Sequence, residues 1–374
     1  MPTIPGAPAP AAHESPVPTA SGPASAPVGR APTLSLELFP PRASASQTWS
    51  ALDRLLGASP DFVSVTYRPA FVITGAPPGA TGRDAAAPAA RVRVVRERNP
   101  AEDVVAHVLA RSDVDLMAHL TCIGYRKRDV VEIIRLFLAM GVRRFLALRG
   151  DPPRGHDADE LPGELAHAED LVRVIREVES EYFDDGERHL TIAVAAYPAV
   201  LDHGRGVEIL AAKQAAGADL AITQVFYDSE DYLSLARAAT YCGVSMPLLP
   251  GILPMTDLSR LSRLASLTGV PIPEGLAASL GPARGAQAVV RGIDATLRLA
   301  TEVLDGGAPG IHLYTFNRTR PALDVISQLR LGGILGGERV SASMQRDVRR
   351  AYLNATPGGD RRMPEPAHAG SARP

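Results

Sequence analysis

The chain has 374 residues, and 39 basic against 41 acidic side chains give it a formal charge of −2 at neutral pH. This balance argues against a nucleic-acid-binding protein, which needs a basic surface to neutralise phosphates. Hydrophobic residues make up 45% of the sequence, enough for a large core, and no apolar run is long enough for a membrane-spanning helix.

The two ends of the chain differ in composition from its middle. Residues 1–32 are rich in proline, alanine and serine without a continuous apolar segment, so we predict a disordered tail rather than a secretory signal. Residues 355–374 have the same character, which leaves one folded domain over residues 33–354. Cys122 and Cys242 are too few for a disulfide framework and indicate a reducing compartment.

Between these ends, short apolar segments rich in β-branched residues alternate with longer helical patterns. Segments that are apolar almost throughout are typical of strands buried on both faces of a parallel sheet. The expected strands are residues 33–39, 62–66, 115–121, 144–150, 190–196, 219–226, 247–253 and 310–316.

The segments between the strands place apolar residues three or four positions apart, as amphipathic helices do. Gly141 and Gly217 follow two of these patterns, where a left-handed residue ends a helix. Strand and helix alternating eight times predict a (β/α)8 TIM barrel. An open doubly wound sheet is the alternative, although no G-x-G-x-x-G motif follows the first strand.

Polar residues cluster at the C-terminal ends of the predicted strands, where barrel enzymes carry their active sites. Glu37 lies inside the apolar segment LSLELF, so it must point into the barrel or be buried. Burial would raise its pKa toward that of a general acid, although a structural pairing with an arginine is equally compatible. Gln224 lies in ITQVF, where a buried amide needs a partner such as a ligand ring.

Other strand ends carry weaker signals. Arg149, Gly150 and Asp151 place a cation, a flexible backbone and an anion together, but a turn with a capping Asp gives the same tripeptide. His119 is either a ligand contact or a satisfied core histidine. Lys213 is one of only two lysines and is either a surface residue or a phosphate contact. The loops over residues 67–99 and 151–165 are long and follow C-terminal strand ends.

Taken in order, these motifs resemble one known family. The segments LELFPPR, SVTY, AHLTC, ALRGD, AAYP, ITQVFYD, GILP and HLYTFNR are similar to those of methylenetetrahydrofolate reductases over residues 33–330. The resemblance implies a TIM barrel of the bacterial, single-domain type. It also implies a cytoplasmic enzyme of one-carbon metabolism and methionine biosynthesis that self-associates.

The activity implied by the resemblance is hydride transfer from NADH or NADPH, through bound FAD, to 5,10-methylenetetrahydrofolate. Glu37 matches the acid that protonates folate, Asp151 a charge beside flavin and pterin, and Gln224 a contact to folate and nicotinamide in turn. Arg318 matches an arginine that binds the folate carboxylate. The positions matching cofactor contacts are Thr66 for nicotinamide and Tyr67, His119, Arg149, Gly150, Asp151, Ala168, Tyr197 and Lys213 for flavin.

The chain departs from the family pattern in the region expected to hold the FAD tail. Gly206, Ile209 and Ala212 stand where the resemblance leads us to expect Asp, Asn and Arg, and Arg260 replaces a glutamine on the folate side. Two alternatives follow: direct hydride transfer from NAD(P)H to the folate without flavin, and a barrel that binds folate or a partner protein without turnover. The histidines and carboxylates lack metal-ligand spacing, so no metal is expected.

Overall fold

The computed structural model describes residues 31–41, 45–67, 70–74, 91–95, 99–152, 161, 163–200, 202–283 and 285–336. The predicted tails, residues 1–32 and 355–374, lie outside this part of the chain apart from residues 31 and 32, as do residues 337–354 of the predicted domain.

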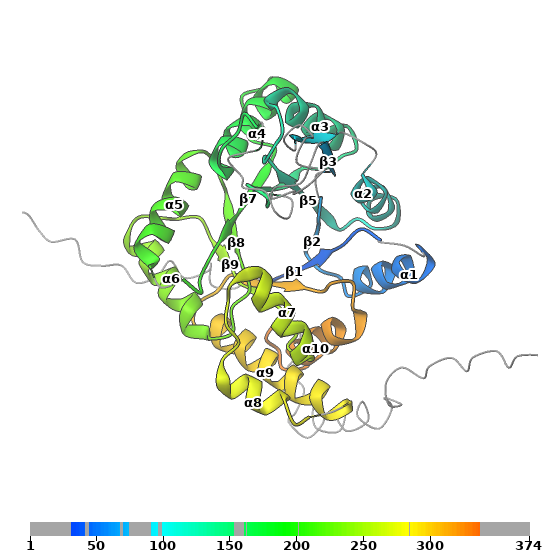
Figure 1. The fold of residues 1–374 in the computed structure, drawn as a ribbon, viewed down its shortest axis with the longest axis vertical. Helices are drawn as coiled ribbons and strands as arrows, with labels where there is room; N and C mark the ends of the chain where they lie inside the picture. The colour runs from blue at the N-terminus through cyan, green and yellow to red at the C-terminus, as the bar shows by residue number, and fades with distance from the viewer. Residues whose placement is uncertain are drawn as a thin grey trace, which may run out of the picture.

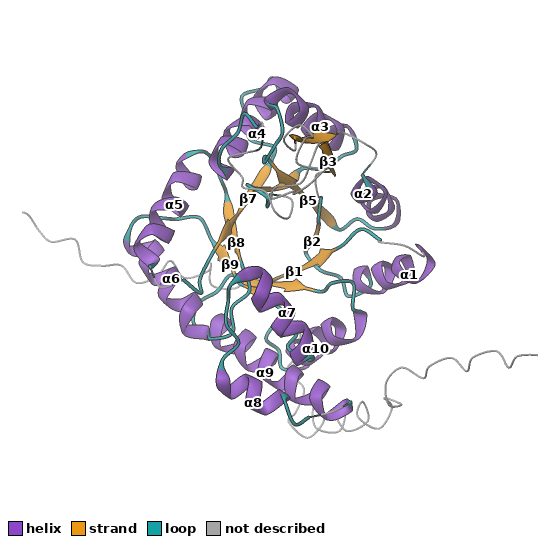
Figure 2. Ribbon diagram, viewed as in Figure 1, coloured by secondary structure: helices purple, strands orange, loops and turns teal. Residues whose placement is uncertain are grey.

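A ring of parallel strands forms the centre of the fold, and helices surround it (Figures 1 and 2). All the strands predicted from the sequence are present, with the spatial order β10-β11-β1-β2-β5-β6-β7-β8-β9, which confirms the (β/α)8 barrel. The barrel strands are β1 (Thr33–Leu38), β2 (Phe62–Val65), β5 (Asp115–Thr121), β6 (Arg144–Leu148), β7 (Thr191–Ala196), β8 (Leu220–Thr223), β9 (Leu248–Leu249), β10 (Gly251–Ile252) and β11 (Gly310–Tyr314).

The ring closes through one predicted strand that Pro250 divides in two. Proline has no N–H to donate, so the chain pairs with β8 before Pro250 and with β11 after it. The carbonyl of Pro250 still accepts a hydrogen bond from His312 N at 2.9 Å, and Gly251 N donates to Thr223 Oγ1 at 2.8 Å. The segment therefore joins both neighbours and leaves no open edge between them.

The alternation of side chains along each strand separates two environments. On β1, Leu34, Leu36 and Leu38 belong to the large core between the strands and the helices. Ser35 and Glu37, which alternate with them, face the interior of the barrel. A separate apolar cluster also faces the interior, formed by Phe62, Met117, Leu146, Ala193, Ile222 and Leu249.

The helices cover the outside of the strands. Gly141 and Gly217 follow α3 and α5 with φ of +97° and +110°, as predicted for left-handed helix ends. No helix in the described ranges is long and apolar enough to cross a membrane. The helices are α1 (Ala45–Leu56), α2 (Pro100–Arg111), α3 (Lys127–Ala139), α4 (Ala168–Phe183), α5 (His203–Ala215), α6 (Ser229–Tyr241), α7 (Leu258–Thr268), α8 (Glu274–Leu280), α9 (Ala286–Asp305) and α10 (Thr319–Leu331).

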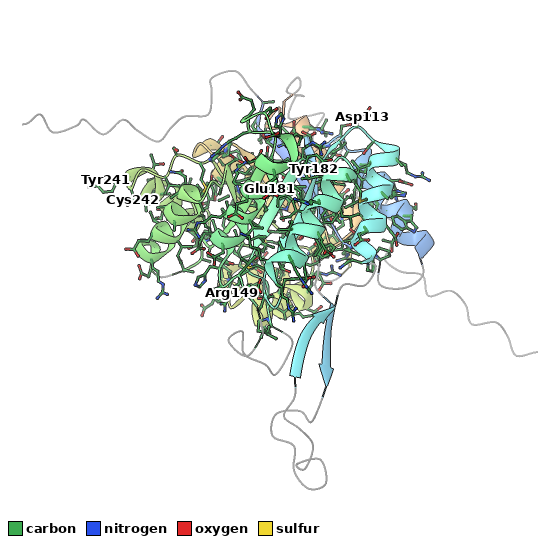
Figure 3. All side chains as sticks on the ribbon, turned by 90° about the horizontal axis from the view of Figure 1, so that it is seen from above. Asp113, Arg149, Glu181, Tyr182, Tyr241 and Cys242 are labelled. Atoms are coloured by element: carbon green, nitrogen blue, oxygen red, sulfur yellow. The ribbon has the colours of Figure 1, made fainter. Side chains whose placement is uncertain are left out.

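The long loop predicted over residues 67–99 contains an antiparallel hairpin of β3 (Ala70–Thr74) and β4 (Arg91–Val95). It projects from the end of the barrel on which Arg149 lies (Figure 3). Arg149 follows the C-terminal end of β6, so the hairpin stands on the C-terminal face, where the candidate site is found.

Candidate active site

Glu37 lies inside the barrel near its C-terminal end and is 7% exposed. Its Oε1 accepts a hydrogen bond from Thr66 Oγ1 at 3.1 Å and lies 4.0 Å from His119 Nδ1. Burial lowers the pKa of His119 to about 3, so the imidazole is neutral and this contact is no ion pair at neutral pH. A carboxyl group beside neutral polar groups, facing a barrel mouth, is placed to give or take a proton.

Tyr314 lies beside Glu37 on the neighbouring strand and hydrogen-bonds to the end of β8. It is the register partner of Glu37 on β11, and its hydroxyl donates to the carbonyl of Thr223 at 2.6 Å. Burial raises the pKa of Tyr314, and the nearby Glu37 and Tyr197 raise it further, so the phenol stays protonated. Gly251 is needed here, because a Cβ would lie 2.6 Å from the Tyr314 ring and 2.2 Å from the Thr223 carbonyl oxygen.

The barrel interior around Glu37 holds further polar side chains, and the buried Ser64 Oγ and His119 Nε2 both lack a hydrogen-bond partner among the described residues. His312 Nδ1 lies 2.8 Å from Ser35 Oγ, and burial, with His119 nearby, lowers the pKa of His312 to about 3. His119 Nε2 is buried without a hydrogen-bond partner in the described part of the chain. A ligand could pair this buried nitrogen, and the flavin contact at His119 stays a prediction.

A second group of predicted residues lies where β6, β7 and α5 meet. Lys213 is 5% exposed, and its Nζ donates to Ala195 O at 2.7 Å and lies 5.9 Å from the centre of the Tyr197 ring. The surface-lysine alternative is therefore wrong. Burial lowers the pKa of Lys213 to about 8, against the opposing effect of Glu169. The nearby Asp151 adds to the effect of burial in raising the pKa of Tyr197.

The Arg149–Gly150–Asp151 turn passes very close to β5. Gly150 has φ of +88°, and a Cβ there would lie 2.8 Å from Ile123 and 2.9 Å from Thr121. Glycine is therefore required for this close approach. Arg149 and Asp151 are exposed on the rim.

Two predicted residues, Gln224 and Tyr67, lie differently from the sequence expectation. Gln224 follows β8 instead of lying within it, is half-buried, and accepts a hydrogen bond from Val225 N through its own Oε1. The Tyr67 ring packs edge-on against Phe137 in the outer core, 5.7 Å between ring centres, away from the interior group. Ala168 is buried as the first residue of α4.

Arg318 is exposed at the start of α10, on the rim above β11. The sequence interpretation did not single out Ser35 or His312. Their side chains contact each other inside the barrel, two residues before Glu37 and Tyr314 on the same strands. Counting alternate residues back from Glu37 and Tyr314 along their strands would have placed both inside the barrel.

Comparisons with known proteins agree with this architecture. A family model described as methylenetetrahydrofolate reductase matches residues 25–330. A 5,10-methylenetetrahydrofolate reductase of Escherichia coli is 31% identical over 76% of this chain and 86% of its own length. A probable methylenetetrahydrofolate reductase (NADPH) of Caenorhabditis elegans is 31% identical over 82% of this chain, and a methylenetetrahydrofolate reductase (NADH) 1 of Arabidopsis thaliana is 28% identical over 83%. This chain spans about half the length of these two animal and plant relatives, 43% and 50%. The chain belongs to the methylenetetrahydrofolate reductase family.

Proposed function

We propose that this chain reduces 5,10-methylenetetrahydrofolate to 5-methyltetrahydrofolate with hydride from NADH or NADPH. The observation that carries the proposal is the position of Glu37, a buried carboxyl group at the mouth of the barrel with a hydroxyl donor, Thr66, on one side and neutral histidine on the other. Family membership supports the choice of substrate and reductant.

In this reaction Glu37 acts as the acid. Its carboxyl proton passes to a nitrogen of the five-membered ring that holds the methylene bridge, the carbon–nitrogen bond breaks, and an iminium ion forms. Hydride then adds to the iminium carbon to give the methyl group, and NAD(P)H leaves as NAD(P)⁺. Asp151 supplies a negative charge near the cation, and Gln224 offers its amide NH₂ to the pterin or to nicotinamide, whichever occupies the mouth.

FAD is the hydride carrier implied by the family resemblance, and the described residues fit its ring end. The unpaired His119 Nε2 offers one hydrogen bond, and the close turn at Gly150 leaves backbone exposed for contact. Lys213 holds a buried ammonium beside the Tyr197 ring and would pair with a phosphate. When bound, FAD accepts hydride from NAD(P)H and gives it to the folate. Arg149, Ala168 and Tyr197 complete the proposed set of flavin contacts.

The ribose and diphosphate of FAD have fewer candidate contacts in this chain than the flavin ring has. This favours direct hydride transfer from NAD(P)H to the folate as the second candidate. Gly206, Ile209 and Ala212 are neutral, and Ile209 is 42% exposed on α5. No polar side chain from these positions can hold a ribose or a diphosphate. In direct transfer the same mouth would hold NAD(P)H and folate together, with Glu37 in the same role.

One cuvette experiment separates the candidates. The protein is purified without added cofactor and its visible spectrum recorded, before and after anaerobic NADH and then with 5,10-methylenetetrahydrofolate. Flavin bands that bleach with NADH and recover with the folate support FAD-mediated transfer. A colourless protein that consumes NADH only with the folate supports direct transfer. A colourless protein that remains inactive with added FAD would overturn the proposed reaction and support a binding-only barrel.

A further inference from the structure

Tyr314 reaches from one strand of the barrel to the end of another. It lies on β11, and its hydroxyl donates to the carbonyl of Thr223, the last residue of β8, at 2.6 Å. The phenol passes over Gly251, where a Cβ would lie 2.6 Å from the ring and 2.8 Å from the hydroxyl oxygen. The contact therefore spans the place where Pro250 divides a strand, and it depends on the missing side chain of residue 251.

The peptide that joins Thr223 to Gln224 is held at both of its polar groups. Tyr314 donates to its carbonyl, and its N–H, that of Gln224, donates to Ala196 O at 2.7 Å. The Thr223 side chain is held as well, because its Oγ1 accepts from Gly251 N at 2.8 Å. A peptide unit is planar, so the two hydrogen bonds to one unit fix its orientation and with it the Cα of Gln224.

The side chain of Gln224 is also restrained by its own backbone. Its Oε1 accepts a hydrogen bond from Val225 N at 2.9 Å. A primary amide has one oxygen and one NH₂, so the NH₂ is the group that Gln224 can offer to a ligand. A donor held in one place before the ligand arrives loses little conformational entropy on binding, and its hydrogen bond then adds more to the affinity.

The hydroxyl of Tyr314 is not available as an acid. A phenol has a single proton to donate, and the Thr223 carbonyl accepts it. Burial raises the pKa of Tyr314, and Glu37 and Tyr197 raise it further, so no phenolate forms at neutral pH. Tyr314 lies beside the acid Glu37, but its hydroxyl can affect the reaction only through the groups that it holds in place.

We propose that Tyr314 is a positioning residue, which holds the Thr223–Gln224 peptide so that the Gln224 amide meets both the pterin and the nicotinamide. The proposal rests on the proposed function and adds to it a residue to which the sequence interpretation gives no role. It requires that loss of the Tyr314 hydroxyl weakens the binding of both ligands. It also requires that this loss acts only through Gln224.

Tyr314→Phe removes the hydroxyl and keeps the ring, and Tyr232→Phe is the matched control. Tyr232 also donates to the carbonyl of a barrel strand, that of Leu248 at 2.8 Å, but it belongs to the outer core. Tyr314→Phe should raise KM for 5,10-methylenetetrahydrofolate and for NAD(P)H about fivefold each, as for loss of one hydrogen bond, and leave kcat within about twofold. Tyr232→Phe should change neither KM by more than about twofold.

A double-mutant cycle with Gln224→Ala distinguishes positioning from other roles. In the Gln224→Ala background, Tyr314→Phe should raise neither KM by more than about twofold, because the group that it positions is gone. A fivefold rise in both backgrounds would overturn the proposal and assign Tyr314 to direct contact with the ligands or to the shape of the barrel. A shifted pH profile of kcat in Tyr314→Phe would also overturn it, since the hydroxyl would then act on Glu37. Unchanged KM values would show that the hydrogen bond does not affect binding.

A binding measurement keeps this test separate from the proposed reaction. Calorimetric titration with 5-methyltetrahydrofolate needs no turnover, and the wild type, the two single variants and the double variant form the same cycle. Non-additive losses of affinity in a protein without turnover would support the positioning role and reject the proposed reaction. Additive losses would reject the positioning role, with or without turnover. A wild type that does not bind this folate would reject both.

Discussion

Side chains that face the inside of the barrel are of two kinds. Phe62 and Met117 belong to an apolar cluster, whereas Ser35, His312 and Glu37 are polar. Burial lowers the pKa of His312 and of His119 to about 3. The polar side chains inside the barrel therefore include two histidines that carry no charge at neutral pH.

The role of Glu37 can be tested through the two half-reactions. Glu37→Gln keeps the size of the side chain and removes the proton donor, so folate reduction should fall by about 10²- to 10⁴-fold. Oxidation of NAD(P)H with an artificial electron acceptor should stay within a few-fold of wild type when flavin is bound. Glu177→Gln, an exposed position paired with Lys127, is the control and should change neither rate. A parallel fall of both half-reactions in Glu37→Gln would mean that Glu37 is not the acid.

The buried histidines predict how stability depends on pH. In the folded state His312 has a pKa of about 3, against 6.5 as the ordinary value, so the unfolded chain takes up a proton first as the pH falls. The stability is unaffected above about pH 6.5 and decreases below it, by on the order of 2 kcal/mol at pH 5 for this one residue. His119 contributes in the same direction.

Urea unfolding at pH 7 and pH 5 measures this effect. The wild type should lose more stability between the two pH values than His312→Asn, in which the polar atom facing Ser35 remains and the titrating group is gone. The difference between the two losses should be about 2 kcal/mol. Equal losses in both proteins would show that His312 is protonated in the folded state.

The sequence predicts residue types at the mouth better than it predicts their contacts. Glu37 and Lys213 were identified from their positions in the chain, and both are buried. The contacts of His312 and Tyr314 were not predictable, because each depends on a partner from a strand distant in sequence. Gln224 was expected inside a strand, and β8 ends one residue earlier because the chain turns there toward α6.

At the scale of elements, several acidic residues near the site serve as helix caps. Asp202, Asp228 and Asp257 each accept a backbone hydrogen bond at the start of α5, α6 and α7. A carboxylate in this position satisfies N–H groups that the helix leaves unpaired and interacts favourably with the helix dipole. Their positions in the chain alone would suggest a role in catalysis, but these carboxylates serve as helix caps.

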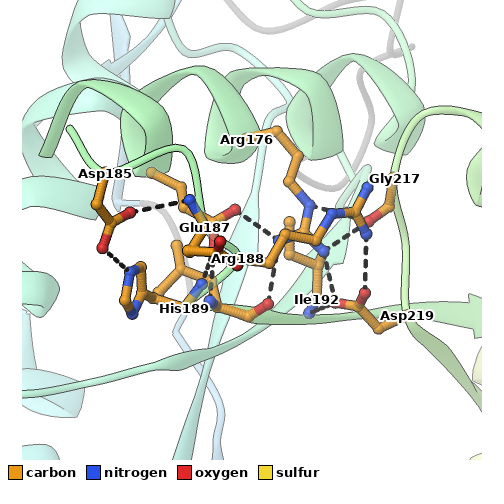
Figure 4. A network of polar contacts seen from close by, with 10 residues as sticks. Arg176, Asp185, Glu187, Arg188, His189, Ile192, Gly217 and Asp219 are labelled. Carbon is orange, nitrogen blue, oxygen red and sulfur yellow. Dashed lines mark hydrogen bonds and ion pairs between the residues drawn. The ribbon is translucent and has the colours of Figure 1, made fainter. Parts of the chain in front are cut away.

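At the opposite face of the barrel, Arg176 makes a network of hydrogen bonds and ion pairs. Arg176 on α4 donates to the carbonyl of Gly217 and to the carboxylate of Asp219, as Figure 4 shows. It also donates to the carbonyl of Leu190 and to the carboxylate of Glu179. The Arg176 and Glu179 side chains are 14% and 4% exposed. This network joins α4 to the start of β7 and β8, away from the chemistry, so its contribution is to stability.

Removing this arginine should be costly. Arg176→Met leaves the buried Glu179 without its cationic partner, and we expect a loss of about 3 kcal/mol in the free energy of unfolding. Arg173→Met is the matched control on the same helix, since Arg173 forms an exposed pair with Asp170 and should lose less than about 1 kcal/mol. Urea denaturation of both variants decides the point. Similar losses would show that burial does not distinguish the two pairs.

The sequence predicts each strand of the barrel, but it does not predict the β3–β4 hairpin. Each barrel strand is a short apolar segment, a pattern that needs no information about its partners. The register of the hairpin pairs Ala70 with Val95 across a long Gly- and Pro-rich connection. Sequence signals for hairpins depend on short turns, so this pairing leaves no comparable signal.

At the scale of the whole molecule, the fold was recognisable because many weak signals occur in one order. No single motif is specific, but polar residues recur at the same end of most predicted strands, and barrel closure brings these ends together. The sequence predicts a closed barrel from the number of strands, but it does not predict that Pro250 divides one of them, because residues 247–253 look like one continuous segment.

Binding of FAD should stabilise the whole barrel. A ligand at about 100 times its Kd adds about 2.7 kcal/mol to the stability of the folded state, which raises Tm by on the order of 5 °C. Thermal unfolding with FAD and with riboflavin tests the role of Lys213, because riboflavin lacks the phosphate and should give a smaller shift. The same shift with both would remove Lys213 from the flavin site. No shift with FAD would favour direct transfer.

The hairpin β3–β4 forms a two-stranded sheet of its own, and each of its strands has a single partner among the described residues. Half of its amide hydrogens point away from the partner strand, so they should exchange with deuterium far faster than those of the barrel strands. Residue-resolved exchange rates of the β3 and β4 amides would therefore measure opening of the hairpin separately from opening of the barrel. Slower exchange in β3 and β4 on addition of a substrate would report directly that the ligand has reached this face.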